Sequence, residues 1–213
     1  MESPFQRFLN RMTDLLILNL ITLLACLPVV TAGAALTAMH YVLLKMVRGQ
    51  EGYVVRSFWR SFRQNFVQAT VIWVVMLFYG LFAGSNLFAM LTGPAGGTPV
   101  WIPVLLAASV ILEYLLMLYV FPLLSRYENP VKDTLLNAMM LVFGRLPLTA
   151  EMAVIMAVPA AMALWVTPLL PLAALFGLSV PGYACAMLYS PLFSQIEGEE
   201  SMKEEHGEPG TEE

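Results

Sequence analysis

Long apolar runs, separated by short polar or turn-forming breaks, dominate this chain of 213 residues. Most of the runs have about the length that an α-helix needs to cross the roughly 30 Å hydrocarbon core of a bilayer. The pattern predicts an all-α, polytopic transmembrane helical bundle. We expect about six spans, at residues 9–30, 34–47, 67–91, 101–124, 146–167 and 169–193.

The first break is expected at Pro28 and residues 31–33. Proline disfavours helical backbone in the residue before it, and Gly33 allows a tight reversal. The segment 7–34 also resembles a cleavable signal peptide, with two arginines before an apolar region. Asp14 and Asn19 interrupt that region, so we expect the segment to be retained as the first span.

The stretch 53–70 departs from the apolar pattern. At 100° per residue it places five apolar side chains on one side of a helix and three arginines on the other. The apolar side carries Val55, Phe58, Trp59, Phe62 and Phe66, and the basic side carries Arg56, Arg60 and Arg63. Such a helix lies in the membrane interface, with aromatics at the acyl boundary and arginines toward phosphate headgroups. We therefore expect an interfacial amphipathic helix at 53–66, directly before the third span.

Composition excludes a water-soluble globular domain, because 59% of the residues are hydrophobic and only 12% are charged. The formal net charge of -4 hides an asymmetry, since eight of the fifteen acids lie in 197–213. The end of the chain is rich in Glu, punctuated by Gly and Pro, and almost free of apolar residues. We expect a transmembrane domain over 1–195 and a disordered, acidic, cytoplasmic tail over 196–213.

The basic residues predict the orientation. If the N-terminus is cytoplasmic, six spans place all ten bases of the body on the cytoplasmic side, and the three outer turns contain no charged residue. These bases are Arg7, Arg11, Lys45, Arg48, Arg56, Arg60, Arg63, Arg126, Lys132 and Arg145. The positive-inside rule then predicts that both termini are cytoplasmic.

Three polar residues, Asn19, His40 and Glu113, are expected near the bilayer midplane. A charged side chain there is costly by at least about 2.5 kcal/mol, so Glu113 should face the protein interior and be neutral or partnered. These residues could form interhelical hydrogen bonds that fix packing, or a polar lining for a solute or proton path. Breaks at Pro159 and 181–182 favour the second reading if they open a cavity, although ordinary kinking explains them as well.

Small residues provide surfaces for close helix contact at Gly80 and Gly84, either within one chain or between protomers.

Two readings also stay open for Arg56, Arg60 and Arg63. They form a solvated face that obeys the topology, or they recognise anionic lipid or an acidic cytoplasmic partner.

No template for known chemistry is present. The sequence lacks G-x-x-x-x-G-K-[ST], H-E-x-x-H and G-x-S-x-G, and Cys26 and Cys185 lie in apolar runs without a C-x-x-C pair. We expect no enzymatic activity, no metal, no cofactor and no nucleic-acid partner.

The run 27–70 resembles the YesL-like family of bacterial membrane proteins, a family of unknown function. The resemblance is carried by residues 27–31, by Phe62-Arg63-Gln64-Asn65-Phe66, and by a second patch at 121–127, FPLLSRY. It extends over most of the chain up to about Phe193. It implies a multi-pass protein of the bacterial plasma membrane, often found alongside carbohydrate uptake and degradation systems, with no assigned catalytic residue.

Two functional hypotheses follow. The first is a transport-associated component linked to carbohydrate uptake, with Asn19, His40 and Glu113 as a polar midplane site. The alternative is a non-transporting scaffold that recruits anionic lipid or transporter subunits through its basic interfacial helix. Neither the ligand nor the oligomeric state follows from the sequence.

Overall fold

The structure is a computed structural model that describes residues 4–50, 52–93, 99–127, 130–165 and 175–205. These residues form helices and connecting turns, with no strand in the described ranges. The helices are α1 (Pro4–Cys26), η1 (Val29–Thr31), α2 (Ala32–Val47), α3 (Val54–Gln64), α4 (Phe66–Thr92), α5 (Trp101–Arg126), α6 (Val131–Gly144), α7 (Leu146–Trp165) and α9 (Ser179–Glu205). The expected all-α polytopic bundle is confirmed.

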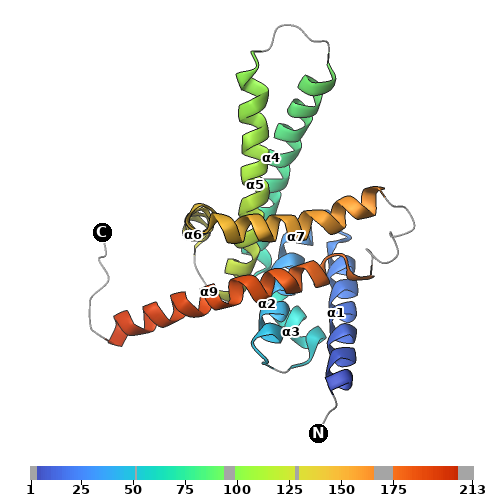
Figure 1. Cartoon of the computed structure of the whole chain (residues 1–213), viewed down its shortest axis with the longest axis vertical. Coiled ribbons are helices and arrows are strands. Elements are labelled where there is room, and N and C mark those ends of the chain that lie inside the picture. The colour runs from blue at the N-terminus through green and yellow to red at the C-terminus, as the bar shows by residue number, and fades with distance from the viewer. Residues whose placement is uncertain (1–3, 51, 94–98, 128–129, 166–174, 206–213) are drawn as a thin grey trace.

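Helix α2 lies at the centre of the bundle, where α1, α3, α4, α5 and α9 all pack against it (Figure 1). Of its most apolar stretch 67% is buried within the protein, against 22% for α4 and 28% for α5. Small residues on α2, including Ala34, Ala35 and Ala38, are fully buried. Small side chains let neighbouring helix backbones approach closely, which suits a helix surrounded on all sides.

Gly33 lies inside α2, at a place where α2 packs closely against α4. A Cβ atom at this position would overlap the Trp73 side chain and come within 2.5 Å of the Ala69 carbonyl oxygen. The expectation that the reversal extends to Gly33 is therefore wrong, since α2 begins at Ala32. Gly33 is needed for its lack of a side chain, not for its backbone freedom.

The reversal between α1 and α2 occurs at Pro28. Thr31 closes it, because its hydroxyl donates a hydrogen bond of 2.6 Å to the Ala25 carbonyl, which lies in the last turn of α1. A helix leaves its last four carbonyls without intrahelical partners, and this bond satisfies one of them. The Trp73 indole then ties the turn to α4 by donating to the Val29 carbonyl at 2.7 Å.

Helices α4 and α5 form a long hairpin that extends away from the other helices (Figure 1). Their outer faces carry exposed Phe78, Phe82, Phe88, Leu105 and Ile111. Exposed apolar surface of this extent is expected where a helix contacts lipid.

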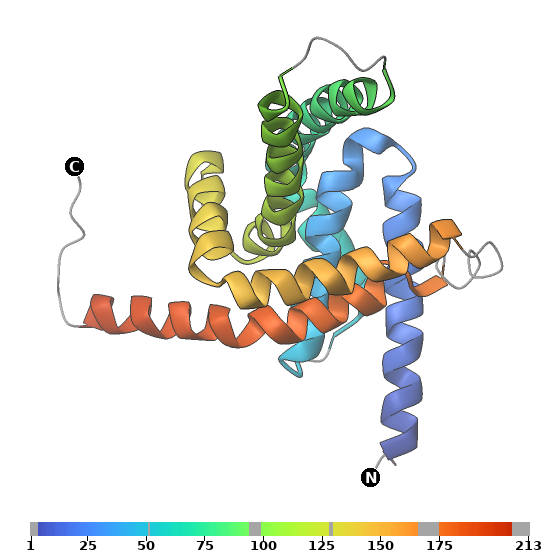
Figure 2. The ribbon, with the colours of Figure 1, turned by 45° about the horizontal axis from the view of Figure 1, so that its top comes forward.

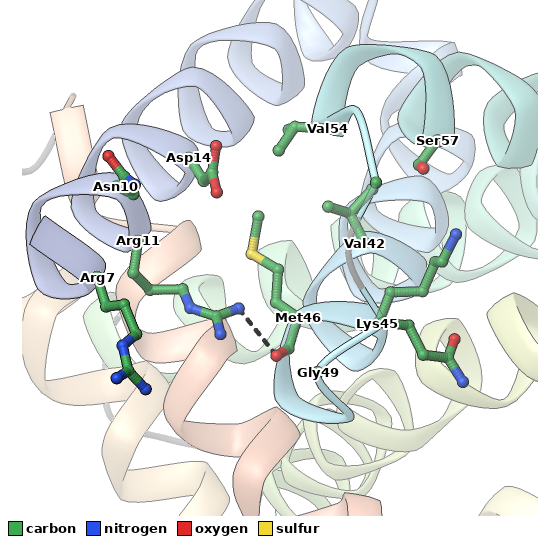
Figure 3. Close-up of a pocket in the computed structure, with 12 residues that line it drawn as sticks. Arg7, Asn10, Arg11, Asp14, Val42, Lys45, Met46, Gly49, Val54 and Ser57 are labelled. Atoms are coloured by element: carbon green, nitrogen blue, oxygen red, sulfur yellow. Dashed lines mark hydrogen bonds between the residues drawn. The ribbon is translucent and has the colours of Figure 1, made fainter. Parts of the chain in front are cut away.

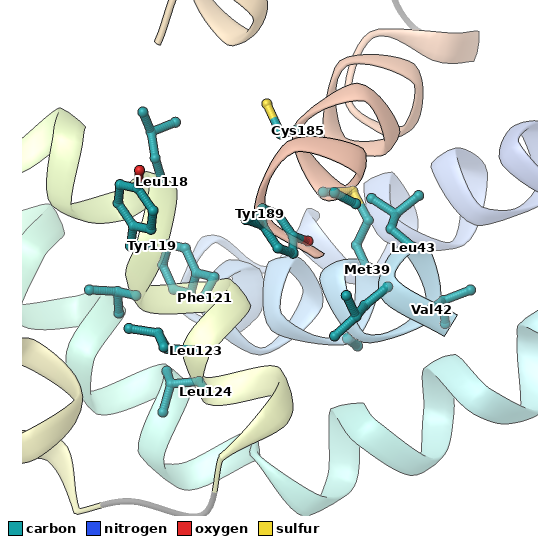
Figure 4. Packing of buried hydrophobic residues seen from close by; sticks show 14 of the residues in the cluster. Met39, Val42, Leu43, Leu118, Tyr119, Phe121, Leu123, Leu124, Cys185 and Tyr189 are labelled. Atoms are coloured by element: carbon teal, nitrogen blue, oxygen red, sulfur yellow. The ribbon is translucent and has the colours of Figure 1, made fainter. Parts of the chain in front are cut away.

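Helices α7 and α9 lie side by side and run across the direction of α4 and α5 in both views (Figures 1 and 2). From α9, Tyr189 projects toward α2, beside Met39 and Leu43 (Figure 4). Gly182 lets the two helices meet, since a Cβ there would lie 2.9 Å from Leu43 Cδ1. The part of α9 from Gly182 to Tyr189 is thus packed onto the central helix.

The described residues contain four helices that are long and apolar enough to cross a membrane, rather than the six expected. These are Phe5–Cys26, Val29–Val47, Phe66–Thr92 and Trp101–Arg126. A fifth is counted if α6 and the segment Leu146–Pro159 form one span, although they are bent by 101°. The sixth expected span, 169–193, includes residues outside the described ranges.

The expected boundary of the tail at residue 196 also differs from the structure, because α9 continues to Glu205. Glu, Lys and Met favour helix, and they dominate 199–205, so the polar sequence extends the helix that precedes it. Residues 206–213 of the expected tail lie outside the described part of the chain.

The close contact of α2 and α4 at Gly33 predicts that an alanine substitution lowers stability at Gly33 but not at Gly84. Gly33→Ala should lower stability by about 1–3 kcal/mol, because the added methyl group pushes α2 away from α4. Gly84→Ala is the matched control, since no described atom lies within 4 Å of its Cβ position. We expect it to leave stability unchanged or raise it by up to about 1 kcal/mol, from helix propensity. Thermal unfolding of the purified protein in detergent measures both, and equal midpoints would contradict the close contact.

Candidate functional site

Asn19 connects α1 to the beginning of α9. Its side chain is fully buried, and its Oδ1 accepts hydrogen bonds from the amides of Leu178 and Ser179 at 3.1 and 3.0 Å. The first amides of a helix have no intrahelical acceptor, so this contact caps α9 from another helix. Of the two roles that the sequence left open for Asn19, this contact is the interhelical hydrogen bond, and its partner could not be identified from the sequence.

His40 connects α2 to the middle of α9. Its Nδ1 is hydrogen-bonded to the Tyr189 hydroxyl at 3.1 Å, and both side chains are buried. The rings also lie near each other, with centroids 6.1 Å apart. Together with Asn19, this bond holds α9 against the first two helices.

Glu113 lies elsewhere, between α5 and α4. It is only 8% exposed, and its carboxylate contacts the backbone at Gly80, where a Cβ would lie 2.9 Å from Oε2. Its Oε1 atom has no hydrogen-bond partner in the described residues. The three residues expected to form one polar site therefore make their contacts with different elements: Glu113 contacts α4, Asn19 the beginning of α9 and His40 the middle of α9.

The proline positions do not open the helices. Pro181 is the third residue of α9, in the first turn, where proline is tolerated because no intrahelical bond is lost. Pro159 lies within α7, which continues on both sides of it. The interruption expected at 181–182 is therefore the beginning of a helix.

Helix α3 has three faces rather than the two expected. Val54, Phe58 and Ser61 are buried and pack against the protein. Val55 and Trp59 are each 44% exposed and form a separate apolar face. The prediction that Phe58 faces lipid is wrong, because Phe58 is fully buried. Periodicity alone does not distinguish apolar positions that meet protein from those that meet lipid.

An aromatic row joins the buried face of α3 to its exposed apolar face. Phe62 stacks on Phe58 at 6.0 Å between ring centroids, and contacts Trp59 at 5.2 Å and Phe66 at 5.4 Å. Aromatic pairs in tilted or edge-on arrangements add to the stability of the contact. The row fixes the orientation of α3 and directs Trp59 outward.

Arg56, Arg60 and Arg63 form the third face of α3. All three are exposed, and no hydrogen bond or ion pair holds them to another described residue. They line a broad, open hollow of about 1000 Å³. Its other lining residues are Tyr41, Lys45, Gly52, Tyr53, Ser57, Trp59 and Gln64. The three guanidinium groups are therefore available to an anion.

A smaller hollow of about 360 Å³ lies beside the first, between α1, the end of α2 and the beginning of α3 (Figure 3). It shares Lys45, Gly52 and Ser57 with the open hollow. Arg7 and Arg11 enter from α1. From the sequence, Arg7 and Arg11 were expected only to mark the cytoplasmic side, although the spacing of Arg7, Arg11 and Asp14 already places the three side chains on one helix face.

Comparison with known families places part of the chain beside a sequence family. Residues 15–87 match the sequence model of DUF624, a family described as a protein of unknown function. No curated protein and no solved structure matches the chain. The matched segment includes α2, α3 and most of α4, and it contains Asn19, His40 and the three arginines of α3. The match extends from the middle of α1 to near the end of α4.

Proposed function

We propose that this protein is a non-enzymatic scaffold of the bacterial plasma membrane that recruits anionic lipid or an acidic partner through α3. The observation that carries the proposal is the exposed row Arg56, Arg60 and Arg63, which has no partner among the described residues. Beside it lies an exposed apolar face that includes Trp59. A basic face next to an aromatic one is the arrangement that binds a membrane surface.

The energetics favour an anionic surface over a neutral one. A lysine or arginine near an anionic leaflet contributes about 1 kcal/mol to binding. Three arginines on one helix face therefore distinguish anionic from neutral headgroups by about two orders of magnitude. Since the buried face of α3 packs on α2, the recognition surface is attached to the rigid centre of the bundle.

The grouping of bases supports an orientation with the N-terminus in the cytoplasm. Arg7 and Arg11 at the beginning of α1, Lys45 at the end of α2 and the α3 arginines line two adjoining hollows. Bases gathered at one end of a bundle are expected on the cytoplasmic side. In line with the YesL-like resemblance, we propose that the protein partner is a subunit of a carbohydrate uptake system.

A second candidate function is a direct part in transport, and Glu113 favours it. A buried carboxylate oxygen without a hydrogen-bond partner is costly, and within membrane spans such groups often belong to ion or solute pathways. Asn19 and His40 have packing partners and do not add to this candidate. The transport proposal therefore depends on Glu113 and on the space that Gly80 leaves beside it.

The scaffold proposal predicts loss of anionic lipid in the triple variant Arg56→Gln, Arg60→Gln and Arg63→Gln. Its preference for phosphatidylglycerol over phosphatidylcholine should fall by about two orders of magnitude, because three charges are lost. Mass spectrometry of the lipids retained by the purified protein measures this preference.

The matched control removes three bases elsewhere, with Arg126→Gln, Lys132→Gln and Arg145→Gln. This variant has the same net charge as the α3 triple variant. Because its α3 arginines are intact, it should keep the lipid preference of the unmodified protein. An equal loss in both triple variants would show that α3 has no special role.

The transport candidate has its own test, which is solute uptake in a strain that lacks the protein. Glu113→Gln keeps the shape of the side chain and removes the ionisable group. If Glu113 serves a path, the variant should restore less than about a tenth of the uptake that the unmodified protein restores. The reason is that a positioned acid–base group typically speeds a proton-transfer step by about 10²-fold or more. Full restoration by Glu113→Gln would remove the transport candidate and leave the scaffold.

A further inference from the structure

The smaller hollow has an excess of positive charge. Three bases line it, Arg7, Arg11 and Lys45, against one acid, Asp14 (Figure 3). Its volume of about 360 Å³ is within the range of sites for small organic ligands. This hollow is formed mainly by α1 and α2, so it differs from the arginine row of α3.

The three bases are held to different degrees. Arg11 is fixed, since its Nη1 donates to the Met46 carbonyl at 2.8 Å and its guanidinium lies 5.9 Å from the Tyr183 ring centroid. Lys45 lies over the Tyr41 ring at 5.6 Å. Neither contact neutralises the charge. Arg7 is exposed, and no described residue pairs with it.

The remaining lining groups are suited to hydroxyls. Asn10, Gln50 and Ser57 offer neutral donors and acceptors, and the Asp14 carboxylate accepts hydrogen bonds only. The Asp14 carboxylate would repel a bare anion, but it can accept a hydrogen bond from a hydroxyl group that belongs to the same ligand as the anion. Gly52 leaves room in the wall, because a Cβ there would already contact Ser57 Oγ at 3.6 Å and Lys45 Nζ at 3.8 Å.

We propose that this hollow binds the phosphate ester of a polyol, with the phosphate on Arg7, Arg11 and Lys45 and a hydroxyl on Asp14. Arginine and lysine bind phosphate by charge-assisted hydrogen bonds, and arginine does so in a bidentate manner. The same chemistry is present in the phosphatidylglycerol headgroup and in soluble glycerol 3-phosphate. This site goes beyond the proposed scaffold function, which depends on the α3 arginines.

The experiment uses the full chain in nanodiscs and has two arms. In the first, glycerol 3-phosphate is titrated into protein in phosphatidylcholine nanodiscs by calorimetry in phosphate-free buffer. In the second, phosphatidylglycerol is exchanged into the nanodiscs, and bound lipid is counted by native mass spectrometry. Binding in the first arm identifies a soluble ester. Binding in the second arm alone identifies the lipid headgroup in this hollow if the lipid count falls in Arg7→Gln with Lys45→Gln, and a count that this variant leaves unchanged overturns the proposal. Absence of binding in both arms overturns the proposal.

The double variant Arg7→Gln with Lys45→Gln should weaken binding by about tenfold or more, because two of the three phosphate contacts are lost. The matched control, Arg60→Gln with Arg63→Gln, removes two bases from α3 only and should change the affinity for glycerol 3-phosphate by less than about twofold. Equal losses in both double variants would show non-specific surface attraction and overturn the site. This control also separates the inference from the scaffold proposal.

A second variant keeps the test valid if the first one unfolds. Asp14→Asn removes the repulsion between the carboxylate and the phosphate, so binding of inorganic phosphate should tighten several-fold. The advantage of glycerol 3-phosphate over inorganic phosphate should shrink, since an amide accepts less strongly than a carboxylate. Unchanged affinities for both probes in Asp14→Asn would overturn the placement of the hydroxyl.

Discussion

The burial of α2 is the constraint on which the rest of the structure depends. Five helices pack against it, and its contact with α4 is close enough that a methyl group at Gly33 would overlap Trp73. Membrane helices gain little from hydrophobic exclusion of one another, so they associate through close packing and polar contacts. Small residues on α2 supply the first of these, and they place α3 at a defined position on the bundle.

Polar residues within the spans supply the polar contacts between helices. Asn19 and His40 bond to different parts of α9, at its beginning and in its middle. The two contacts attach the last described helix to the first two. Groups engaged in this way are less available to a solute. The exposed bases Arg7, Arg56, Arg60 and Arg63 lie at the end where α1, α2 and α3 meet, and the recognition that we propose is placed at that end of the bundle.

Much of the fold could be predicted from the sequence, because hydropathy and periodicity report directly on helices such as α3 and α4. The tertiary contacts of single residues could not be predicted. Gly33 looked like a turn residue because its partner Trp73 is forty positions away, and Phe58 looked lipid-facing because protein and lipid are equally apolar. The smaller hollow was not predicted, since its bases come from separate helices and already satisfied the topology rule.

The most direct test of the account is the depth of α3 in the membrane. Nitroxide labels are placed on single cysteines at Trp59 and at Arg60, after Cys26→Ala and Cys185→Ala, in vesicles that contain phosphatidylglycerol. Power-saturation spectroscopy then compares collisions with oxygen, which concentrates in the acyl region, and with a water-soluble nickel complex. The account predicts that the label at 59 favours oxygen and the label at 60 favours nickel. Equal exposure of both labels to the nickel complex would contradict it.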